Sequence, residues 1–217
     1  MSRTYWAAGA AVLLALLFAA AATVSAASGG GADAAPRTPA LHSPDAGFAR
    51  DMAVHHQQAV EMSFVVRDRT QDEAVRSLAY DIANTQANQR GMLLGWLDLW
   101  GLPKTVAGEP PMSWMGTGDG HAGHGAHTAA PGALMPGMAT KEEITRLGTV
   151  SGREAEVLYL QLMTDHHKGG VAMAEGCARQ CVTPAERALA QGMAEAQQSE
   201  LTLMADMLAK RGAAPRG

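Results

Sequence analysis

The sequence has few aromatic residues, little excess charge and only two cysteines. Aromatic residues make up 5% of the chain, although hydrophobic residues make up 47%. The apolar positions are mostly Ala, Leu, Met and Val, a mixture that favours helix over strand. The net charge is −4, and no basic cluster could neutralise a run of phosphates, so we expect no nucleic-acid partner.

Motifs of the common enzyme classes are missing as well. The sequence has no His-Glu-x-x-His, no Cys-x-x-Cys-His, no phosphate-binding glycine loop and no recognisable nucleophile turn. No Glu is followed by His three residues later, as the helices of di-iron proteins require. Nothing in the sequence therefore indicates catalysis, and a ferritin-type oxidase is disfavoured.

The N-terminal segment has the features of an export signal. Arg3 supplies a positive charge, residues 7–22 are apolar, and small residues around Ala26 provide a cleavage site. We predict that residues 1–27 are a signal peptide, or a membrane anchor if they are not cleaved. Residues 28–42, rich in Gly, Ala and Pro, are predicted to be a flexible linker. Either outcome places the folded part in the periplasm, at the cell surface or outside the cell.

Cys177 and Cys181 are the only cysteines. In an oxidising compartment an even number of cysteines usually indicates a disulfide. A bridge across four residues of a continuous helix would be strained, so a disulfide predicts that the helix ends near these residues. A CxxxC pair can also bind copper, and the spacing leaves this alternative open.

The chain contains an internal repeat. Adding 111 to a position in the first half gives its counterpart in the second half without gaps, as for Met52 and Met163 or Gln86 and Gln197. We predict one helical hairpin over 44–101 and another over 151–212, joined by a loop over 102–140. Two amphipathic hairpins bury their apolar faces best together, so we expect an all-α four-helix bundle over 43–212.

Capping residues mark the ends of the predicted helices. The expected N-terminal signals are Ser43 with Pro44, Thr70 with Glu73, Ser151 with Glu154 and Thr183 with Glu186, and Thr140 with Glu143 for a short additional helix. Gly101 and Gly212 are expected to end the hairpins, because glycine is the preferred residue just beyond a helix.

Histidines and amides occupy helix positions that should face the core. The inward stripes run through Phe48, Met52, His55, Ala59, Met62 and Val66, and through Tyr159, Met163, His166, Gly170, Met173 and Cys177. His56 and His167 complete two His-His pairs. The same spacing turns Gln86, Gln89, Gln197 and Glu200 inward on the second helices. Buried polar groups need partners, and two explanations fit: histidine–amide hydrogen bonds, or metal coordination.

The predicted loop between the repeats is rich in methionine and histidine. It contains Met112, Met115, His121, His124, His127, Met135 and Met138 in a background of Gly and Pro. Seven of the eight histidines of the protein lie either here or in the two pairs. Thioethers select Cu(I) or Ag(I), and imidazole accepts both copper and zinc, so this donor set favours a copper ion, with silver as a substitute. A disordered spacer of no functional meaning is the competing interpretation.

At these residues the sequence resembles a known family. The segments AVHHQQAVEM and MTDHHKGGVAMA, each followed by a helix such as NTQANQRGMLLGWL or AEAQQSELTLMADML, are similar to domain of unknown function 305, as is the MPGM stretch. The resemblance implies a ferritin-like four-helix fold, export, and in some members copper or silver binding. Its motif residues here are His55, His56, His166 and His167, with Met52, Met62, Met163 and Met173. Gln89 departs from the pattern, because the second copy has the usual acidic residue, Glu200.

These observations lead to one leading hypothesis and two rivals. The first is an exported, non-enzymatic copper-binding protein that sequesters, buffers or transfers the ion, with other copper-handling proteins of the envelope as partners. In it the loop acts as a capture arm or lid. The rivals are a helical scaffold whose histidines and glutamines form a structural core layer, and an envelope metalloenzyme, for which the sequence shows no substrate pocket.

Overall fold

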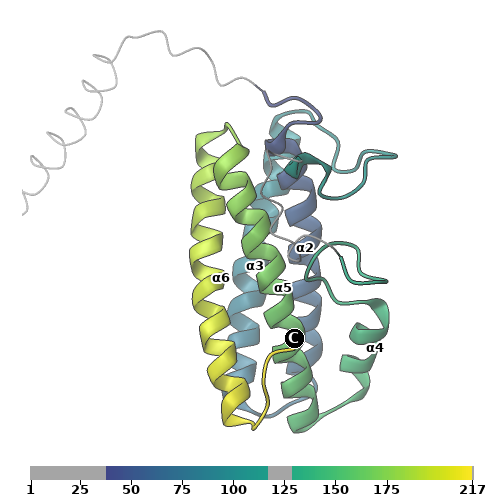
Figure 1. Ribbon diagram of the computed structural model, residues 1–217, viewed down its shortest axis with the longest axis vertical. Helices are drawn as coiled ribbons and strands as arrows, with labels where there is room; N and C mark the ends of the chain where they lie inside the picture. Colours follow the sequence, from purple (N-terminus) through teal and green to yellow (C-terminus); the bar gives the residue numbers. More distant parts are fainter. Residues whose placement is uncertain (1–37, 117–128, 217) are drawn as a thin grey trace, which may run out of the picture. The chain divides into compact units, whose positions relative to one another are not determined.

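The computed structural model describes residues 38–116 and 129–216, and these residues are helical without any strand (Figure 1). The elements are α2 (Pro44–Arg67), α3 (Glu73–Leu99), the 3-10 helix η1 (Ser113–Met115), α4 (Lys141–Thr149), α5 (Gly152–Gln180) and α6 (Pro184–Lys210). Within the described ranges, no helix is long and apolar enough to cross a membrane. The predicted signal peptide or anchor over 1–27 lies outside the described residues.

The four long helices form two hairpins. α2 packs along α3, and α5 packs along α6. The hairpins meet mainly through α2 and α5, while the short α4 lies beside these two helices (Figure 1). Adding 111 to the first and last residues of α3 gives the first and last residues of α6, so the repeat in the sequence is a repeat in the structure.

Several predicted helix ends are confirmed. The Ser43 side chain accepts a hydrogen bond from the Ala46 N–H at the start of α2, and Thr140 and Glu143 form a reciprocal capping box at the start of α4. Gly101 and Gly212 have φ angles of 65° and 61°, the left-handed conformation that glycine adopts without strain. These glycines stop α3 and α6 at matching places.

Three predicted capping boxes do not form. Ser151 precedes α5 but makes no side-chain cap hydrogen bond. At the other two, carboxylates from the opposite hairpin bind the turn. Thr70 does not cap α3; its hydroxyl donates to Glu156 on α5, and Asp72 is the capping residue. Thr183 does not bond Glu186; the Val182 and Thr183 N–H groups donate to Asp45 on α2. Asp45 and Glu156 are 111 residues apart and therefore occupy the same position of the repeat. Each acid binds the turn between the two helices of the other hairpin.

Apolar side chains form two clusters separated by one polar layer. One cluster contains Ala59, Met62 and Val66 of α2 together with Tyr159 and Met163 of α5. The other contains Phe48, Met52, Ala53, Met173 and Cys177. The sequence positions between the clusters carry the His-His pairs of α2 and α5. The predicted inward stripes are therefore buried as expected, and the histidines lie midway along the core.

Candidate metal centre

The polar layer brings both repeats together. α2 and α5 contribute His55, His56, His166 and His167, whose side chains are fully buried. α3 and α6 contribute Gln86 and Gln197, also buried, and Gln89 and Glu200, which are partly exposed. In each hairpin, the histidines of the first helix and the amide or carboxylate residues of the second helix lie at similar distances from the turn. They can therefore meet in one layer.

His55 and His166 are in direct contact across the interface between the hairpins. Their ring centroids are 3.7 Å apart with the planes tilted by 33°. The Nε2 of His166 lies 3.0 Å from the backbone carbonyl oxygen of His55, so Nε2–H donates to that oxygen. This bond fixes the proton of His166 on Nε2 and leaves the lone pair of Nδ1 free to bind a ligand.

His167 has a carboxylate partner. Its Nε2–H donates to Oε2 of Glu200 on α6 at 2.6 Å, and its Nδ1 has no hydrogen-bond partner among the described residues. A carboxylate behind an imidazole is the arrangement that orients histidine ligands and increases their basicity in metal sites. The first copy has Gln89 at the equivalent place, and this neutral amide cannot supply the same charge.

Many polar atoms of the layer have no hydrogen-bond partner among the described residues. They are both ring nitrogens of His55 and His56, the Nδ1 atoms of His166 and His167, both amide atoms of Gln86, and Oε1 of Gln197. Leaving one buried polar group unpaired costs about 1–3 kcal/mol, and natural cores contain few such groups. Imidazole nitrogens with free lone pairs are groups that could hold a metal ion.

Burial keeps the imidazoles of His55, His56 and His166 neutral. It lowers the pKa of His55 to about 3, and the neighbouring His56 and His167 add to that shift, while the backbone of Pro136 lies near enough to oppose part of it without making a well-aligned hydrogen bond. Burial likewise lowers the pKa of His56 to about 3, although Gln89 and Gln86 lie near enough to oppose part of the shift without making a well-aligned hydrogen bond. The pKa of His166 is also lowered, by burial and by His55. Neutral imidazole is the form that binds metals.

Methionine sulfur atoms lie in the apolar clusters on both sides of the layer. Met52 and Met173 belong to one cluster, Met62 and Met163 to the other, and all four are fully buried. No three histidine, cysteine or carboxylate ligand atoms of the layer lie within 4.8 Å of one another in the part of the chain that the structure describes. An ion held here would thus draw on thioethers or amides besides the histidines.

The MPGM segment of the loop packs against the histidine layer. Met135 and Met138 are buried in the same cluster as Met52 and Met173. The backbone of Pro136 and Gly137 touches that of Gly169 on α5, where any side chain would collide. Gln58 on α2 exchanges two hydrogen bonds, of 2.9 and 2.7 Å, with the backbone of Ala139. Met135 and Met138, which the sequence analysis assigned to a capture arm or lid, are therefore core residues.

Met112 and Met115 of the loop lie away from the layer. The Met112 N–H donates to Asp51, and Met115 lies against Gly176, nearly three helical turns beyond His166 on α5. Both methionines are partly buried around η1, beside Trp114. His121, His124 and His127 lie outside the described residues.

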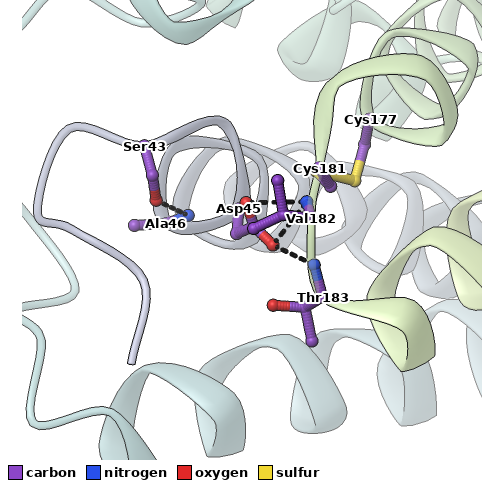
Figure 2. Close-up of a disulfide and its surroundings, with 7 residues drawn as sticks. All are labelled: Ser43, Asp45, Ala46, Cys177, Cys181, Val182 and Thr183. Carbon is purple, nitrogen blue, oxygen red and sulfur yellow. Dashed lines mark hydrogen bonds between the residues drawn. A yellow bond between two sulfur atoms is a disulfide. The ribbon is translucent and has the colours of Figure 1, made fainter. Parts of the chain in front are cut away.

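Cys177 and Cys181 form a disulfide at the end of α5 (Figure 2). Their Cα atoms are 4.8 Å apart, and α5 ends at Gln180, as the sequence argument for a bridge required. Figure 2 shows Asp45 beside them, accepting hydrogen bonds from the Val182 and Thr183 N–H groups. Glu186, in the first turn of α6, completes a buried group that sequence reasoning had considered only as a helix cap.

Fold and site together define a class of protein, in which two related helical hairpins share a buried layer of histidines between methionine-containing clusters. The chain belongs to the family described as domain of unknown function (DUF305), whose family model matches residues 45–208. Among curated proteins, none matches the chain.

Solved structures agree with this assignment. A presumed secreted DUF305 protein from Streptomyces coelicolor is 60% identical, with 82% of this chain and 99% of that chain covered and a TM-score of 0.73. A DUF305 fragment from Deinococcus radiodurans is 28% identical, with coverage of 79% and 99% and a TM-score of 0.62. CopM in its Cu(I)-bound form is 18% identical, with coverage of 76% and 96% and a TM-score of 0.55, a likeness of fold.

Proposed function

We propose that the protein binds copper, and silver in its place, outside the cytoplasm, and sequesters, buffers or hands over the ion. The observation that carries this proposal is the set of fully buried imidazole nitrogens that have no hydrogen-bond partner in the described part of the chain. Neutral imidazoles next to thioethers are a donor set for soft ions, and copper accepts both donors. The proposal requires no catalysis, because the role is to hold the ion.

The proposed ligands are the four histidines together with the nearest buried thioethers. Nδ1 of His166 and of His167 have free lone pairs, and the unpartnered nitrogens of His55 and His56 lie in the same layer. Met52, Met173, Met135 and Met138 would serve one side of the layer, and Met62 and Met163 the other. Gln86, Gln89, Gln197 and Glu200 would orient these ligands or join them. Met112, Met115, His121, His124 and His127 remain the proposed capture residues of the loop.

The compartment and the finer fold class are part of the proposal. A ferritin-like four-helix bundle over 43–212 accounts for the packing of the two hairpins, and a leader over 1–27 followed by a linker would deliver it to the envelope. The disulfide suits an oxidising compartment. The Streptomyces coelicolor relative, presumed to be secreted, supports export.

Relatives with bound metal add support. CopM, which resembles this chain in fold, has structures in Cu(I)-bound, Cu(II)-bound and Ag-bound forms. The rival scaffold function draws on the His166 and His167 hydrogen bonds, which would also fix the packing register of a metal-free core. It leaves the nitrogens of His55 and His56 unexplained, so we prefer the metal site.

Competition titration of the apo protein with Cu(I), Ag(I) and Zn(II) tests the proposal. We expect the His55→Ala/His166→Ala variant to lose one bound ion, or to bind Cu(I) at least about 10-fold more weakly, since even partners behind the ligands are worth about 10–100-fold. His42→Ala is the matched control, because that side chain is 67% exposed. Met52→Leu/Met173→Leu preserves core volume and gives a second variant if the first is unstable. Unchanged stoichiometry and affinity in both variants would refute the site.

A further inference from the structure

A second group of ligand atoms lies at the far end of α5. Both cysteine sulfur atoms and a carboxylate oxygen of Glu186 lie within 4.8 Å of one another. Cys177 is 11 residues beyond His166, which corresponds to about 16 Å along a helix. The group is therefore separate from the histidine layer, although it shares an apolar cluster with Met173.

Helix capping does not explain the position of Glu186. Its side chain is fully buried, and neither carboxyl oxygen makes a well-aligned hydrogen bond among the described residues, although the carboxyl group of Asp45 lies near enough to interact with it. It does not cap α6, because the Thr183 N–H donates to Asp45 instead, at 2.7 Å. A buried carboxyl group beside a second acidic side chain is unfavourable unless a cation or proton compensates it. The cysteines are the nearest groups that could share such a cation.

We propose that Cys177, Cys181 and Glu186 form a second metal site, which binds a thiophilic closed-shell cation such as Cu(I) or Zn(II) when the cysteines are reduced and is closed by their disulfide. Two thiolates and one carboxylate are ligands that zinc and copper both accept. Cys177 lies in the last turn of α5 and Cys181 directly follows the helix, so both sulfur atoms lie together beside Glu186.

The change between the two states balances as a thiol–disulfide exchange. A dithiol reductant provides two electrons and two protons; the S–S bond breaks, Cys177 and Cys181 become thiols, and the reductant closes into its own disulfide. Binding of the cation then releases the two thiol protons and the proton of Glu186 to solvent, as metal binding by thiols generally does. Oxidation of the metal-free thiols reverses the first step.

The surrounding backbone is held without the disulfide. The Cys181 N–H donates to the Cys177 carbonyl oxygen at 2.8 Å, and Asp45 fastens the next two N–H groups to α2. Breaking the S–S bond removes none of these hydrogen bonds. Both sulfur atoms are therefore expected to stay on the side of Glu186 after reduction.

The test compares metal stoichiometry of the full chain before and after reduction. The chain is treated with dithiothreitol, which is then removed under anaerobic conditions, and Zn(II), Co(II) and Cu(I) are titrated separately. We expect the reduced chain to bind one more ion than the oxidised chain, with the thiolate-to-cobalt absorption that marks sulfur ligands. No additional ion, or a loss of helical circular dichroism on reduction, would overturn the proposal.

Variants assign the additional ion to these residues. The Cys177→Ser/Cys181→Ser variant should not bind the additional ion. Glu186→Gln should bind it at least about 10-fold more weakly, because losing an interaction around the ligands costs this much affinity. Glu175→Gln, an exposed carboxylate of α5, is the matched control. An increment that persists in the Cys177→Ser/Cys181→Ser variant would overturn the site. The increment is expected unchanged in His55→Ala/His166→Ala, so this proposal and the proposed function fail independently.

Discussion

Glu200 is the residue that most clearly distinguishes the two halves of the histidine layer. It accepts a hydrogen bond from His167, whereas His56 has only Gln89 and Gln86 nearby. A carboxylate behind a histidine ligand strengthens the metal bond, because it stabilises the partial positive charge of the ring. The second copy should therefore provide the stronger ligands, although the repeat makes the copies alike in sequence.

We predict that Glu200→Gln weakens Cu(I) affinity of the layer by about 10–100-fold. The effect on folding should be small, since Glu200 is partly exposed. Gln89→Glu is the matched change in the other half, and we expect it to strengthen binding. Competition titration measures both. Equal affinities in wild type and Glu200→Gln would mean that His167 is not a ligand.

Glu186 predicts a pH dependence of stability. Burial, followed by the charge of Asp45 and a hydrogen-bonding interaction with it, raises the pKa of Glu186 from 4.5 to about 9. Between these values the folded state holds a proton that the unfolded state has released, so stability falls as the pH rises from about 5 to 9.

We expect Glu186→Gln to remove this dependence, because the amide does not ionise. Urea unfolding of the oxidised, metal-free protein at pH 5, 7 and 9 should show the variant gaining stability relative to wild type as the pH rises. Glu175→Gln, at an exposed site, should follow wild type throughout. A difference between Glu186→Gln and wild type that does not change with pH would contradict the shifted pKa.

The loop segment 135–138 and α5 meet by direct backbone contact. A side chain at Gly169 would collide with the carbonyl group of Pro136, and one at Gly137 would collide with the backbone of Asp165. This contact holds Met135 and Met138 in the core. It depends on glycine, because any residue with a side chain at these two positions would keep the loop farther from α5. The two glycines thus position the loop sulfur atoms beside the histidine layer.

We predict that Gly169→Ala destabilises the protein by about 1–3 kcal/mol and weakens Cu(I) binding, because overpacking displaces the loop. Gly95→Ala in α3 is the control: an added Cβ meets nothing within 4 Å, and the helix should gain about 0.5–1 kcal/mol. Urea unfolding and copper titration test both variants. A Gly169→Ala protein as stable as wild type would show that the loop contact is not required.

Helix positions could be predicted from the sequence, but the links between helices only in part. The inward stripes and the glycine stops follow from local periodicity and backbone preference, and they are found as expected. The caps at Thr70 and Thr183 failed because Glu156 and Asp45 of the other hairpin compete for those turns. Asp45 and Glu156 occupy the same position of the repeat. That equivalence could have indicated a shared role for these acids, but local capping rules consider only residues next to each helix end.

The molecule joins two hairpins around one polar layer, and the repeat predicted that arrangement. The convergence of His55 and His166 followed from equivalent helix positions. The burial of Met135 and Met138 did not, because the composition of the loop resembles a spacer, and only the close approach to Gly169 brings it into the core. The unpartnered nitrogens likewise depend on distances between elements that a sequence does not contain.

Acid should destabilise the metal-free protein. The pKa values of His55 and His56 fall from 6.5 to about 3, so the unfolded state binds more protons as the pH drops from 6.5 toward 3. The contribution of these histidines to stability is fully present above pH 6.5 and is lost below it, by at most about 1.4 kcal/mol per pH unit for each histidine. Urea midpoints of the metal-free Glu186→Gln variant at pH 7, 6 and 5 test this, because the Glu186 carboxyl group acts in the opposite direction over this range in wild type. Midpoints that do not change over this range would mean that the imidazoles are not buried.

X-ray absorption at the copper edge of the oxidised protein loaded with one equivalent of Cu(I) tests the central claim most directly, because the disulfide then blocks the cysteine site. We predict nitrogen scatterers from imidazole together with sulfur from thioether, and a loss of the imidazole signal in His55→Ala/His166→Ala. An unchanged spectrum in that variant, or a shell of oxygen alone in wild type, would contradict a copper site in the histidine layer.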